Sequence, residues 1–279
     1  MSTQIQTCYR HSDRRAGVVC QRCDRPICPD CMRQASVGFH CPECTKQGAQ
    51  KIIRPNQLLQ TRPIVTQALI AINVAVFAAG IGSGMETRDR FTIDGGLIAS
   101  GFNPFTNQLI GVANGEWWRL LSSGFLHANI IHIGFNMFVL YRLGQLLEPV
   151  LGRTRFALAY VVALLGGSLG VMLLDPNALT VGASGAVFGL MGVAVAVFRS
   201  RGINVMDTGL GATILLNLAF TFAIPGISIG GHIGGLIVGF VAGTLLTDVG
   251  PRYLKDPSLI LGAVVALGVV VAGSAILVA

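Results

Sequence analysis

Gly182-Ala183-Ser184-Gly185 is the stretch around which this chain is organised, because it places a serine among small residues at the head of a hydrophobic helix. Two interpretations are open at this point. The small residues serve close helix packing, or they leave room for a substrate carbonyl to approach a nucleophilic serine. The serine alone does not decide between them. The decision depends on whether a base and oxyanion donors elsewhere in the chain fall at the same depth.

The composition is that of a polytopic membrane protein. The 279 residues are 52% hydrophobic and only 12% charged, with a mean hydropathy of +0.64, whereas about a quarter of the residues in average soluble proteins are charged. Long apolar runs separated by short charged segments predict membrane spans. The net charge of +7 is explained by positive residues retained on the cytosolic side, so nucleic acid is not an expected partner.

Seven spans are expected, and their flanking charges set the orientation. With a cytosolic N-terminus, 17 of the 20 Lys and Arg residues lie in inside segments, which is the positive-inside pattern. We therefore expect an integral, multi-pass protein of a prokaryotic plasma membrane, with its C-terminus outside. The fourth to sixth spans are short and Gly-rich, which suits spans shielded from lipid by their neighbours. The expected spans are 64–82, 125–147, 155–174, 183–199, 208–224, 230–247 and 258–278.

The connection 83–124 is long for a loop of a membrane protein. It carries several aromatic residues, among them Trp117 and Trp118, and tryptophan prefers the headgroup level. We therefore expect an outer loop that lies partly in the membrane interface. Trp118-Arg119, near the end of the loop, has two interpretations. It is a specific motif, or it is an ordinary interfacial aromatic residue followed by an arginine that snorkels to the membrane surface. Composition alone does not favour either one.

Polar residues at the heads of the second, fourth and sixth spans are expected to converge. These spans all run from outside to inside in the orientation above, and each carries its polar groups in the first two or three turns. His132 and Asn136 are four residues apart and share a helix face, while Ser184 and His232 open the other two spans. Polar groups within a membrane are costly and face the bundle interior. His127 is expected at the water-exposed outer end.

The convergence predicts nucleophilic acyl transfer. Ser184 would attack a carbonyl carbon, and His232 would take its proton and return it to the leaving amine. Asn136 and His132, together with the backbone N–H of Ser184, would donate to the oxyanion. No Asp or Glu lies at this depth in the three spans, so we expect a Ser–His dyad without a third member.

Neighbours of the dyad are expected to support this geometry. Gly185 belongs to a small face on the fourth span, and Gly235 begins another below His232; such faces let two helices approach closely. Phe188, four residues after Ser184, would lie one turn below it and stack on His232. The glycines would serve the same packing in a protein without chemistry.

A polar head precedes the spans and holds all seven cysteines. With His11 they form four pairs of two-residue spacing, and each pair can reach one tetrahedral ion from a single turn. Eight ligands suit two structural Zn²⁺ ions, which would supply the folding energy that so small a segment lacks. No secretory signal precedes the head, and a reducing cytosol disfavours disulfides. The pairs are Cys8 and His11, Cys20 and Cys23, Cys28 and Cys31, and Cys41 and Cys44.

The ligand pairs can be combined in two ways. The head resembles B-box and RING-like cross-braced fingers, in which the first and third pairs hold one ion and the second and fourth pairs hold the other. Sequential pairing is the alternative, and His40 is a spare that could replace a neighbouring ligand. We expect a structural module over 1–50, followed by a linker over 51–62, that docks a cytosolic protein. Its Arg-rich loops are interpreted as solvated charges rather than as a lipid or nucleic-acid site.

The membrane body resembles the rhomboid family of intramembrane serine proteases over about residues 64–250. The matching motifs, in order on the expected spans, are Trp118-Arg119, His127-x4-His132-x3-Asn136, Gly182-x-Ser184-Gly185, and His232 followed by small residues.

The resemblance implies an all-α six-helix core over 63–250 with a seventh span in 251–279, and cleavage of transmembrane substrates near small residues. It also implies a Ser–His dyad that needs no cofactor, with Gly182, Gly185 and Phe188 in support. Phe188 stands where relatives often have Tyr, which keeps ring stacking but not a phenolic hydrogen bond. Glu148-x3-Gly152 resembles a further family feature, expected to be structural.

The sequence is compatible with three classes of function to different degrees. The leading one is a serine endopeptidase that cuts transmembrane segments near the outer face of the bilayer. The alternative is a catalytically silent rhomboid-like scaffold that binds client helices and uses the zinc head as an adaptor, but a scaffold needs neither Ser184 nor His232. A transporter or channel is disfavoured because the span centres lack charged residues.

Overall fold

The computed structural model describes residues 6–35, 37–48, 62–82 and 85–279. The chain forms two compact units, Met1–Gln57 and Leu58–Ala279, which are described separately below as the head and the membrane body. The predicted linker, 51–62, lies outside the described residues except for its last position.

The described part of the head consists of two short antiparallel hairpins, a 3-10 helix and a short α-helix. Strand β1 (Val18–Val19) pairs with β2 (Pro26–Ile27), and β3 (Arg33–Gln34) pairs with β4 (Phe39–His40). A 3-10 helix, η1 (Pro29–Cys31), joins the hairpins, and helix α1 (Pro42–Gly48) follows them. Cysteines dominate the buried core of this unit, so its interior consists mainly of candidate metal ligands.

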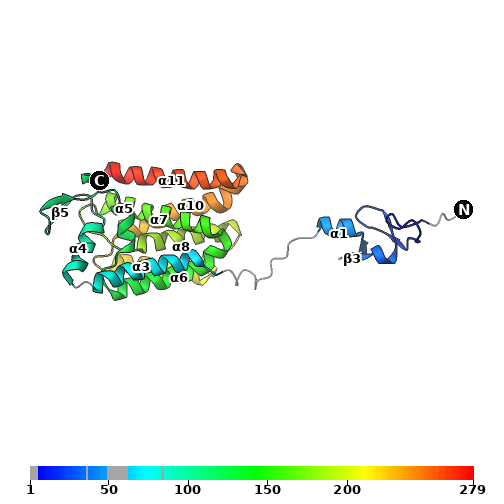
Figure 1. Cartoon of the computed structure of the whole chain (residues 1–279), viewed down its shortest axis with the longest axis horizontal. Helices are drawn as coiled ribbons and strands as arrows, with labels where there is room; N and C mark the ends of the chain where they lie inside the picture. The colour runs from blue at the N-terminus through cyan, green and yellow to red at the C-terminus, as the bar shows by residue number, and fades with distance from the viewer. Residues whose placement is uncertain (1–5, 36, 49–61, 83–84) are drawn as a thin grey trace. The chain divides into compact units, whose positions relative to one another are not determined.

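Helices occupy all seven predicted spans of the membrane body, but among the described residues five are long and apolar enough to cross a membrane. Helix α8 has 17 residues and α9 has 15, whereas about 20 are needed to cross the hydrocarbon layer. Figure 1 shows α3, α6, α7, α8, α10 and α11 running alongside one another. The bounds are α3 Ile64–Gly82, α6 Ile130–Leu151, α7 Arg153–Leu174, α8 Ser184–Ser200, α9 Gly209–Ala223, α10 Ile229–Thr244 and α11 Pro257–Val278.

Two predicted boundaries are wrong. Helix α6 begins at Ile130 rather than at residue 125, because Asn129 caps it by accepting a hydrogen bond from the His132 amide at 2.9 Å. The sixth span does not end at residue 247, because α10 continues into a π-helix, η5 (Leu245–Leu254). The loop expected before the last span therefore shrinks to a short connection.

Helix α8 lies at the centre of the body, packed against α7 and α10. Most of its residues are buried. Glycines let α10 approach it closely: a Cβ added at Gly235 would lie 2.0 Å from the Gly185 carbonyl oxygen, and one at Gly239 would lie 2.1 Å from that of Gly189. The small faces read from the sequence thus meet each other, which places the N-terminal turns of α8 and α10 side by side.

Helix α9 differs from the expectation that the short spans are shielded by their neighbours. Most of its side chains are exposed, and the buried positions are Gly211, Asn217 and Thr221. The prediction was wrong for this span because a short helix is not necessarily an enclosed one. Its buried side chains are polar, while its apolar side chains are exposed or only partly buried; Leu210, Ile214 and Leu218 pack against the core.

The outer loop is more structured than its length suggested. It contains α4 (Met85–Gly95), a hairpin of β5 (Gly101–Asn103) and β6 (Gln108–Ile110), a 3-10 turn η2 (Val112–Asn114), and α5 (Arg119–Ser122) followed by η3 (Ser123–Phe125). The elements α4, β5 and α5 lie at the end of the body where the chain's C-terminus is found (Figure 1).

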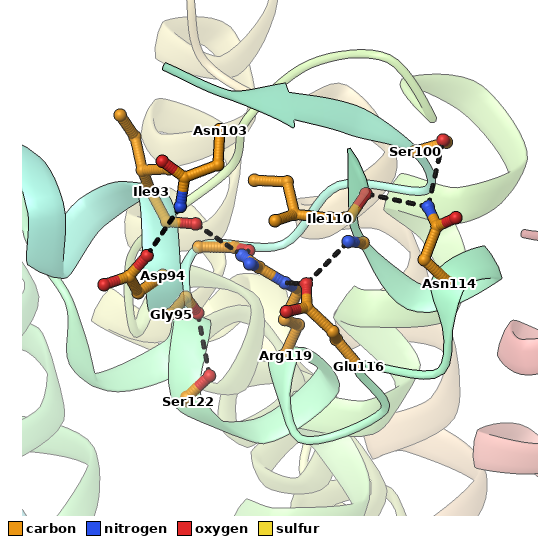
Figure 2. A network of polar contacts seen from close by, with 12 residues as sticks. Ile93, Asp94, Gly95, Ser100, Asn103, Ile110, Asn114, Glu116, Arg119 and Ser122 are labelled. Atoms are coloured by element: carbon orange, nitrogen blue, oxygen red, sulfur yellow. Dashed lines mark hydrogen bonds and ion pairs between the residues drawn. The ribbon is translucent and has the colours of Figure 1, made fainter. Parts of the chain in front are cut away.

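Arg119 holds this loop together from inside. Its Nε contacts Glu116 Oε2 at 2.6 Å, and its Nη1 donates to the carbonyl oxygens of Ile93 and Gly96, both at 2.6 Å (Figure 2). The side chain is 1% exposed, so the snorkelling interpretation is wrong. The neighbouring Trp117 and Trp118 are exposed, as expected for aromatic residues at an interface.

Glu148 ties the second predicted span to the first. Its carboxylate accepts hydrogen bonds from the backbone amides of Val65 and Thr66 at 2.9 and 2.8 Å, and from the Thr66 hydroxyl at 2.7 Å. These donors lie in the first turn of α3, where amides have no partner within the helix. A carboxylate at a helix N-terminus is favourable, which gives Glu148 the structural role expected from its motif.

Candidate active site

The turn that leads into Ser184 is fixed by the outer loop. Leu97 and Thr180 exchange backbone hydrogen bonds of 2.9 and 2.8 Å, and the amide of Gly182 donates to the Ser123 carbonyl at 2.9 Å. Ser122 in turn donates to the Gly95 carbonyl at 2.7 Å (Figure 2). The loop anchored by Arg119 therefore sets the position of the backbone just before the candidate nucleophile.

Gly182 is required at this turn for two reasons. Its φ is +133°, a conformation that side chains with a Cβ rarely adopt. A Cβ here would also lie 2.7 Å from Cε1 and Nε2 of His132 and 3.7 Å from Ser184 Oγ. His132 and Ser184 therefore converge on the space that the missing side chain leaves.

Ser184 begins α8 at an N-terminus without a side-chain cap. The N-cap residue is Ala183, and no side chain accepts a hydrogen bond there. By contrast, Asn129 caps α6 and Ser228 caps α10. The first amides of a helix lack intrahelical partners, so the uncapped start of α8 leaves donors beside Ser184.

His232 lies in the first turn of α10 and is 8% exposed. Phe188 stacks on its ring, with centroids 4.0 Å apart and an interplanar angle of 16°. Its Nδ1 lies 2.7 Å from the hydroxyl oxygen of Thr221 on α9. Ring face and ring edge are thus held by two different helices.

A cavity opens beside Ser184. Its lining includes backbone and small side chains from α7, α8 and α10 and from the turn before α8, among them Gly182, Gly185 and Gly231. None of the hydrogen bonds among the described residues joins Ser184 Oγ to His232. Catalytic hydrogen bonds are often loose in an unliganded enzyme, and the packing of α8 on α10 holds the two residues in the first turns of adjacent helices.

The remaining predicted site residues come from α6 and the segment before it. Asn136 is buried, and its Nδ2 donates to the His132 carbonyl at 3.1 Å. His127 was expected to be exposed, and that was wrong: it is 5% exposed, its Nε2 lies 3.5 Å from the Ala183 amide, and its ring meets that of His132 edge-on with centroids 5.0 Å apart. Residues of α3 and α4 line a small cavity together with His127, so segments distant in the sequence surround it.

Two polar residues near the site were missed from the sequence. Thr221 contacts His232, and Asp175 accepts from the Ser228 hydroxyl at 2.8 Å at the start of α10. Asp175 ends α7, and its acidic type before a predicted loop was a usable signal for a helix-capping partner. A single threonine in an apolar span gave no comparable signal, because its hydroxyl is readily satisfied by a carbonyl one turn earlier.

The head brings its eight candidate ligands into two clusters in which the ligand atoms lie within 4.8 Å of one another. Both clusters combine alternate pairs, as a cross-brace does, and not sequential ones. His40 belongs to neither cluster. The members are Cys8, His11, Cys28 and Cys31 in one, and Cys20, Cys23, Cys41 and Cys44 in the other.

Distances within the clusters fit a tetrahedral metal ion. His11 Nδ1 lies 3.4 Å from the sulfur atoms of both Cys28 and Cys31, and the sulfur atoms of Cys23 and Cys41 are 3.8 Å apart. Zinc with bonds of about 2.3 Å to sulfur and 2.0 Å to nitrogen requires separations of about 3.8 and 3.5 Å in a tetrahedron. The Sγ of Cys8 lies farther away, 3.9 Å from His11 Nδ1, and both clusters could hold a metal ion.

The thiols differ in their tendency to ionise. Burial opposes ionisation of Cys8, but hydrogen bonds from the backbone of Cys28, Arg10 and His11 lower the pKa of its thiol to about 6. In the other cluster, burial again opposes ionisation, and backbone hydrogen bonds, first from Cys41, lower the pKa of Cys20 to about 6.

In each cluster the pKa of a second thiol is raised instead of lowered. Burial and the neighbouring Cys8 and Cys28 raise the pKa of Cys31 to about 11, and hydrogen bonding with Cys41, followed by burial, raises the pKa of Cys44 to about 12. A crowded set of thiolates is what a bound cation neutralises.

Comparison with known proteins agrees with the arrangement of the membrane body. The Rhomboid domain family matches residues 114–249. The chain is 35% identical to rhomboid protease GluP of Bacillus subtilis (strain 168) over 72% of its own length and 38% of that protein. It is 36% identical to the rhomboid relative YdcA of the same strain, over 49% of its own length and 70% of that protein. It is 38% identical to Rhomboid-like protease 1 of Toxoplasma gondii, over 48% of either chain. With its apolar helices, the chain is an integral membrane protein that belongs to the rhomboid family of intramembrane proteases.

Proposed function

We propose that this chain is a serine endopeptidase that cleaves transmembrane segments near the outer membrane face through a Ser184–His232 dyad. The observation that carries the proposal is the approach of Ser184 and His132 at Gly182, at an uncapped helix N-terminus beside a cavity that Ser184 lines. His232 supports it from the adjacent first turn of α10, with its ring fixed by Phe188.

Acylation would begin with attack of Ser184 Oγ on the scissile carbonyl carbon. As the C–O bond forms, the hydroxyl proton passes to His232 Nε2, and the carbonyl oxygen becomes an oxyanion. Collapse of the tetrahedral intermediate breaks the C–N bond, and the proton on Nε2 goes to the leaving amine. The substrate's N-terminal part remains as an ester on Ser184.

Deacylation would repeat these steps with water. Nε2 takes a proton from the attacking water, the new tetrahedral intermediate expels Ser184 Oγ, and the proton returns to the serine. This sequence regenerates the enzyme and needs no metal or cofactor at the dyad. In each half the oxyanion would be met by the Ser184 amide, His132 and Asn136. The uncapped α8 N-terminus adds a favourable dipole at that point.

The substrate would lie in the bilayer with its cleavage site at the outer ends of α6, α8 and α10. We place the chain in the plasma membrane of a prokaryote as part of this proposal. The asymmetry of Lys and Arg supports a cytosolic N-terminus and an outside C-terminus. A glycine-lined cavity favours small side chains at the scissile bond, because bulkier ones would meet backbone atoms.

Purified protein in detergent with a fluorogenic transmembrane peptide tests this function. We expect turnover that Ser184→Ala and His232→Ala each abolish. Ser200→Ala is a matched control, because this serine lies at the other end of α8 and bonds only within its helix. Thermal unfolding would verify that the variants are folded. Cleavage that persists in Ser184→Ala would refute the mechanism, and a folded wild type without turnover would favour the silent client-binding scaffold.

For the head, we propose that each cluster holds one structural Zn²⁺ ion and that the module docks a cytosolic protein. All eight ligands are used in the two clusters, so neither ion has an open position for catalysis. Metal analysis of the purified chain should give about two zinc ions, the number set by two four-ligand sites. A Cys20→Ser, Cys23→Ser double variant should lose one of them, and loss of none would contradict the two-site arrangement.

A further inference from the structure

Helix α9 buries two polar side chains, while its apolar side chains are exposed or only partly buried. Asn217 is 7% and Thr221 is 2% exposed, whereas Leu215, Leu216 and Phe222 are among its exposed residues. Asn217 and Thr221 are four residues apart and share one face of the helix. Polar groups within a membrane protein are costly and are retained on interior faces where they meet a partner. The partner of Thr221 is His232.

The hydrogen bonds of Thr221 indicate which atom donates. Its Oγ1 lies 2.8 Å from the Asn217 carbonyl oxygen and 2.7 Å from His232 Nδ1. A hydroxyl has one hydrogen and two lone pairs. The arrangement that satisfies all three groups has Thr221 donating to the carbonyl oxygen and accepting from Nδ1–H. The proton of the neutral imidazole then resides on Nδ1, and Nε2 keeps its lone pair.

This tautomer is the one that a general base for Ser184 requires. The dyad was expected to lack a third member because no carboxylate lies at its depth. A neutral hydroxyl still fixes the tautomer and ring orientation, because the hydrogen bond at one imidazole nitrogen sets which nitrogen is protonated. Phe188 holds the face of the same ring, so rotation of the imidazole is restricted in two directions.

We propose that Thr221 is a positioning residue for the dyad: its hydroxyl on α9 accepts the Nδ1 proton of His232 and keeps Nε2 free to take the proton of Ser184. The proposal rests on the function proposed above. It assigns to α9 a direct role in the geometry of the catalytic base, because Asn217 and Thr221 are the side chains that this helix buries.

Substitutions on α9 test the proposal with the full chain in detergent. Thr221→Val removes the hydroxyl at nearly constant volume, and Thr221→Ser retains it. Thr213→Val is the matched control, because Thr213 donates to the Gly209 carbonyl of its own helix in the same way, in an exposed hydrogen bond two turns before Thr221. We expect kcat to fall about 10- to 100-fold in Thr221→Val, less than loss of all general acid–base catalysis, with KM unchanged. Thr221→Ser and Thr213→Val should retain wild-type kcat.

Nitrogen-15 NMR of histidine-labelled protein measures the tautomer without reference to activity. The signal of His232 is assigned by its loss in His232→Ala. The wild type should show the Nδ1–H tautomer, and Thr221→Val should gain the Nε2–H form. An Nε2–H wild type, or a Thr221→Val variant with wild-type kcat, overturns the proposal, as does a serine variant that loses as much activity as the valine variant. Failure of the proposed function would be seen separately, as turnover that survives Ser184→Ala.

Discussion

The cysteine-rich head and the membrane body are stabilised in opposite ways. Apart from Ile27, the buried hydrophobic residues in the described part of the head are all cysteines, so the interior of this unit is its ligand set. The body has a core of aliphatic and aromatic side chains, with α8 at its centre and glycine contacts between helices. Polar groups in the body serve to fix particular loops and helix ends. We therefore expect changes that unfold the head to leave peptide cleavage by the membrane body intact.

Removal of the metal should produce the largest effect and confine it to the head. Structural zinc contributes about 10–16 kcal/mol of apparent binding free energy in small fingers, and both clusters lie in the first compact unit. A strong chelator should therefore unfold the head while peptide cleavage continues. Limited proteolysis and the cleavage assay on the same sample measure the two. A parallel loss of cleavage would show that the units are coupled.

Arg119→Ala should be the most damaging of three charge substitutions. It leaves the Glu116 carboxylate and two carbonyl oxygens without their buried partner, and breaking a buried ion pair costs about 3–5 kcal/mol. The free energy of unfolding in detergent should fall by that amount, and cleavage should fall with it because the loop positions the Ser184 turn. Arg142→Ala, at an exposed position on α6, serves as control. Equal stability of the two variants would remove Arg119 from its structural role.

Glu148→Gln should have an intermediate effect. The amide keeps the shape of the side chain but loses the charge that meets three donors at the start of α3. Hydrogen bonds to charged groups contribute about 1.5–3 kcal/mol, so thermal unfolding should report a loss in that range. Gln145→Ala, an exposed neighbour on the same helix, should be near neutral. A loss in Gln145→Ala that matched Glu148→Gln would indicate a general sensitivity of α6.

Arg14→Ala in the head should have the smallest effect. Arg14 forms an ion pair with Asp30, but the two side chains are 49% and 67% exposed. Exposed pairs contribute less than about 1 kcal/mol, so zinc affinity and unfolding temperature of the head should stay near the wild-type values. A large loss would contradict a head whose stability comes from its metal sites, and would require a structural role for its surface charges.

Much of the fold follows from local sequence patterns. The apolar runs correctly predicted a helix at every expected span, and the rhomboid motifs correctly predicted the family. The errors concern burial and helix ends rather than helix formation. His127 was interpreted as exposed and α9 as enclosed, a snorkelling Arg119 was left open beside a specific motif, and two span boundaries were wrong. Burial depends on which loop or helix folds over a residue, and a single sequence does not encode that in its nearest neighbours.

The residues of the candidate site also differ in whether the sequence alone could identify them. Ser184, His232 and Asn136 could be selected because polar groups are conspicuous in apolar spans and the charges ordered the spans by direction. Thr221 could not, because a threonine that bonds a carbonyl one turn earlier is common in apolar helices. Its contact with His232 depends on the rotation of α9 about its own axis, which no local pattern reports.

By itself, the sequence determined the ligand pairs of the head, the apolar helices and the residue types for acyl transfer, because each is specified by spacing along one short segment. Tertiary structure decided which ligand pairs meet, that Gly182 leaves space between His132 and Ser184, and that the imidazole has a hydroxyl at Nδ1. These features require segments distant in the chain to approach within hydrogen-bonding or van der Waals distance. Only the packing of whole helices and loops sets that approach.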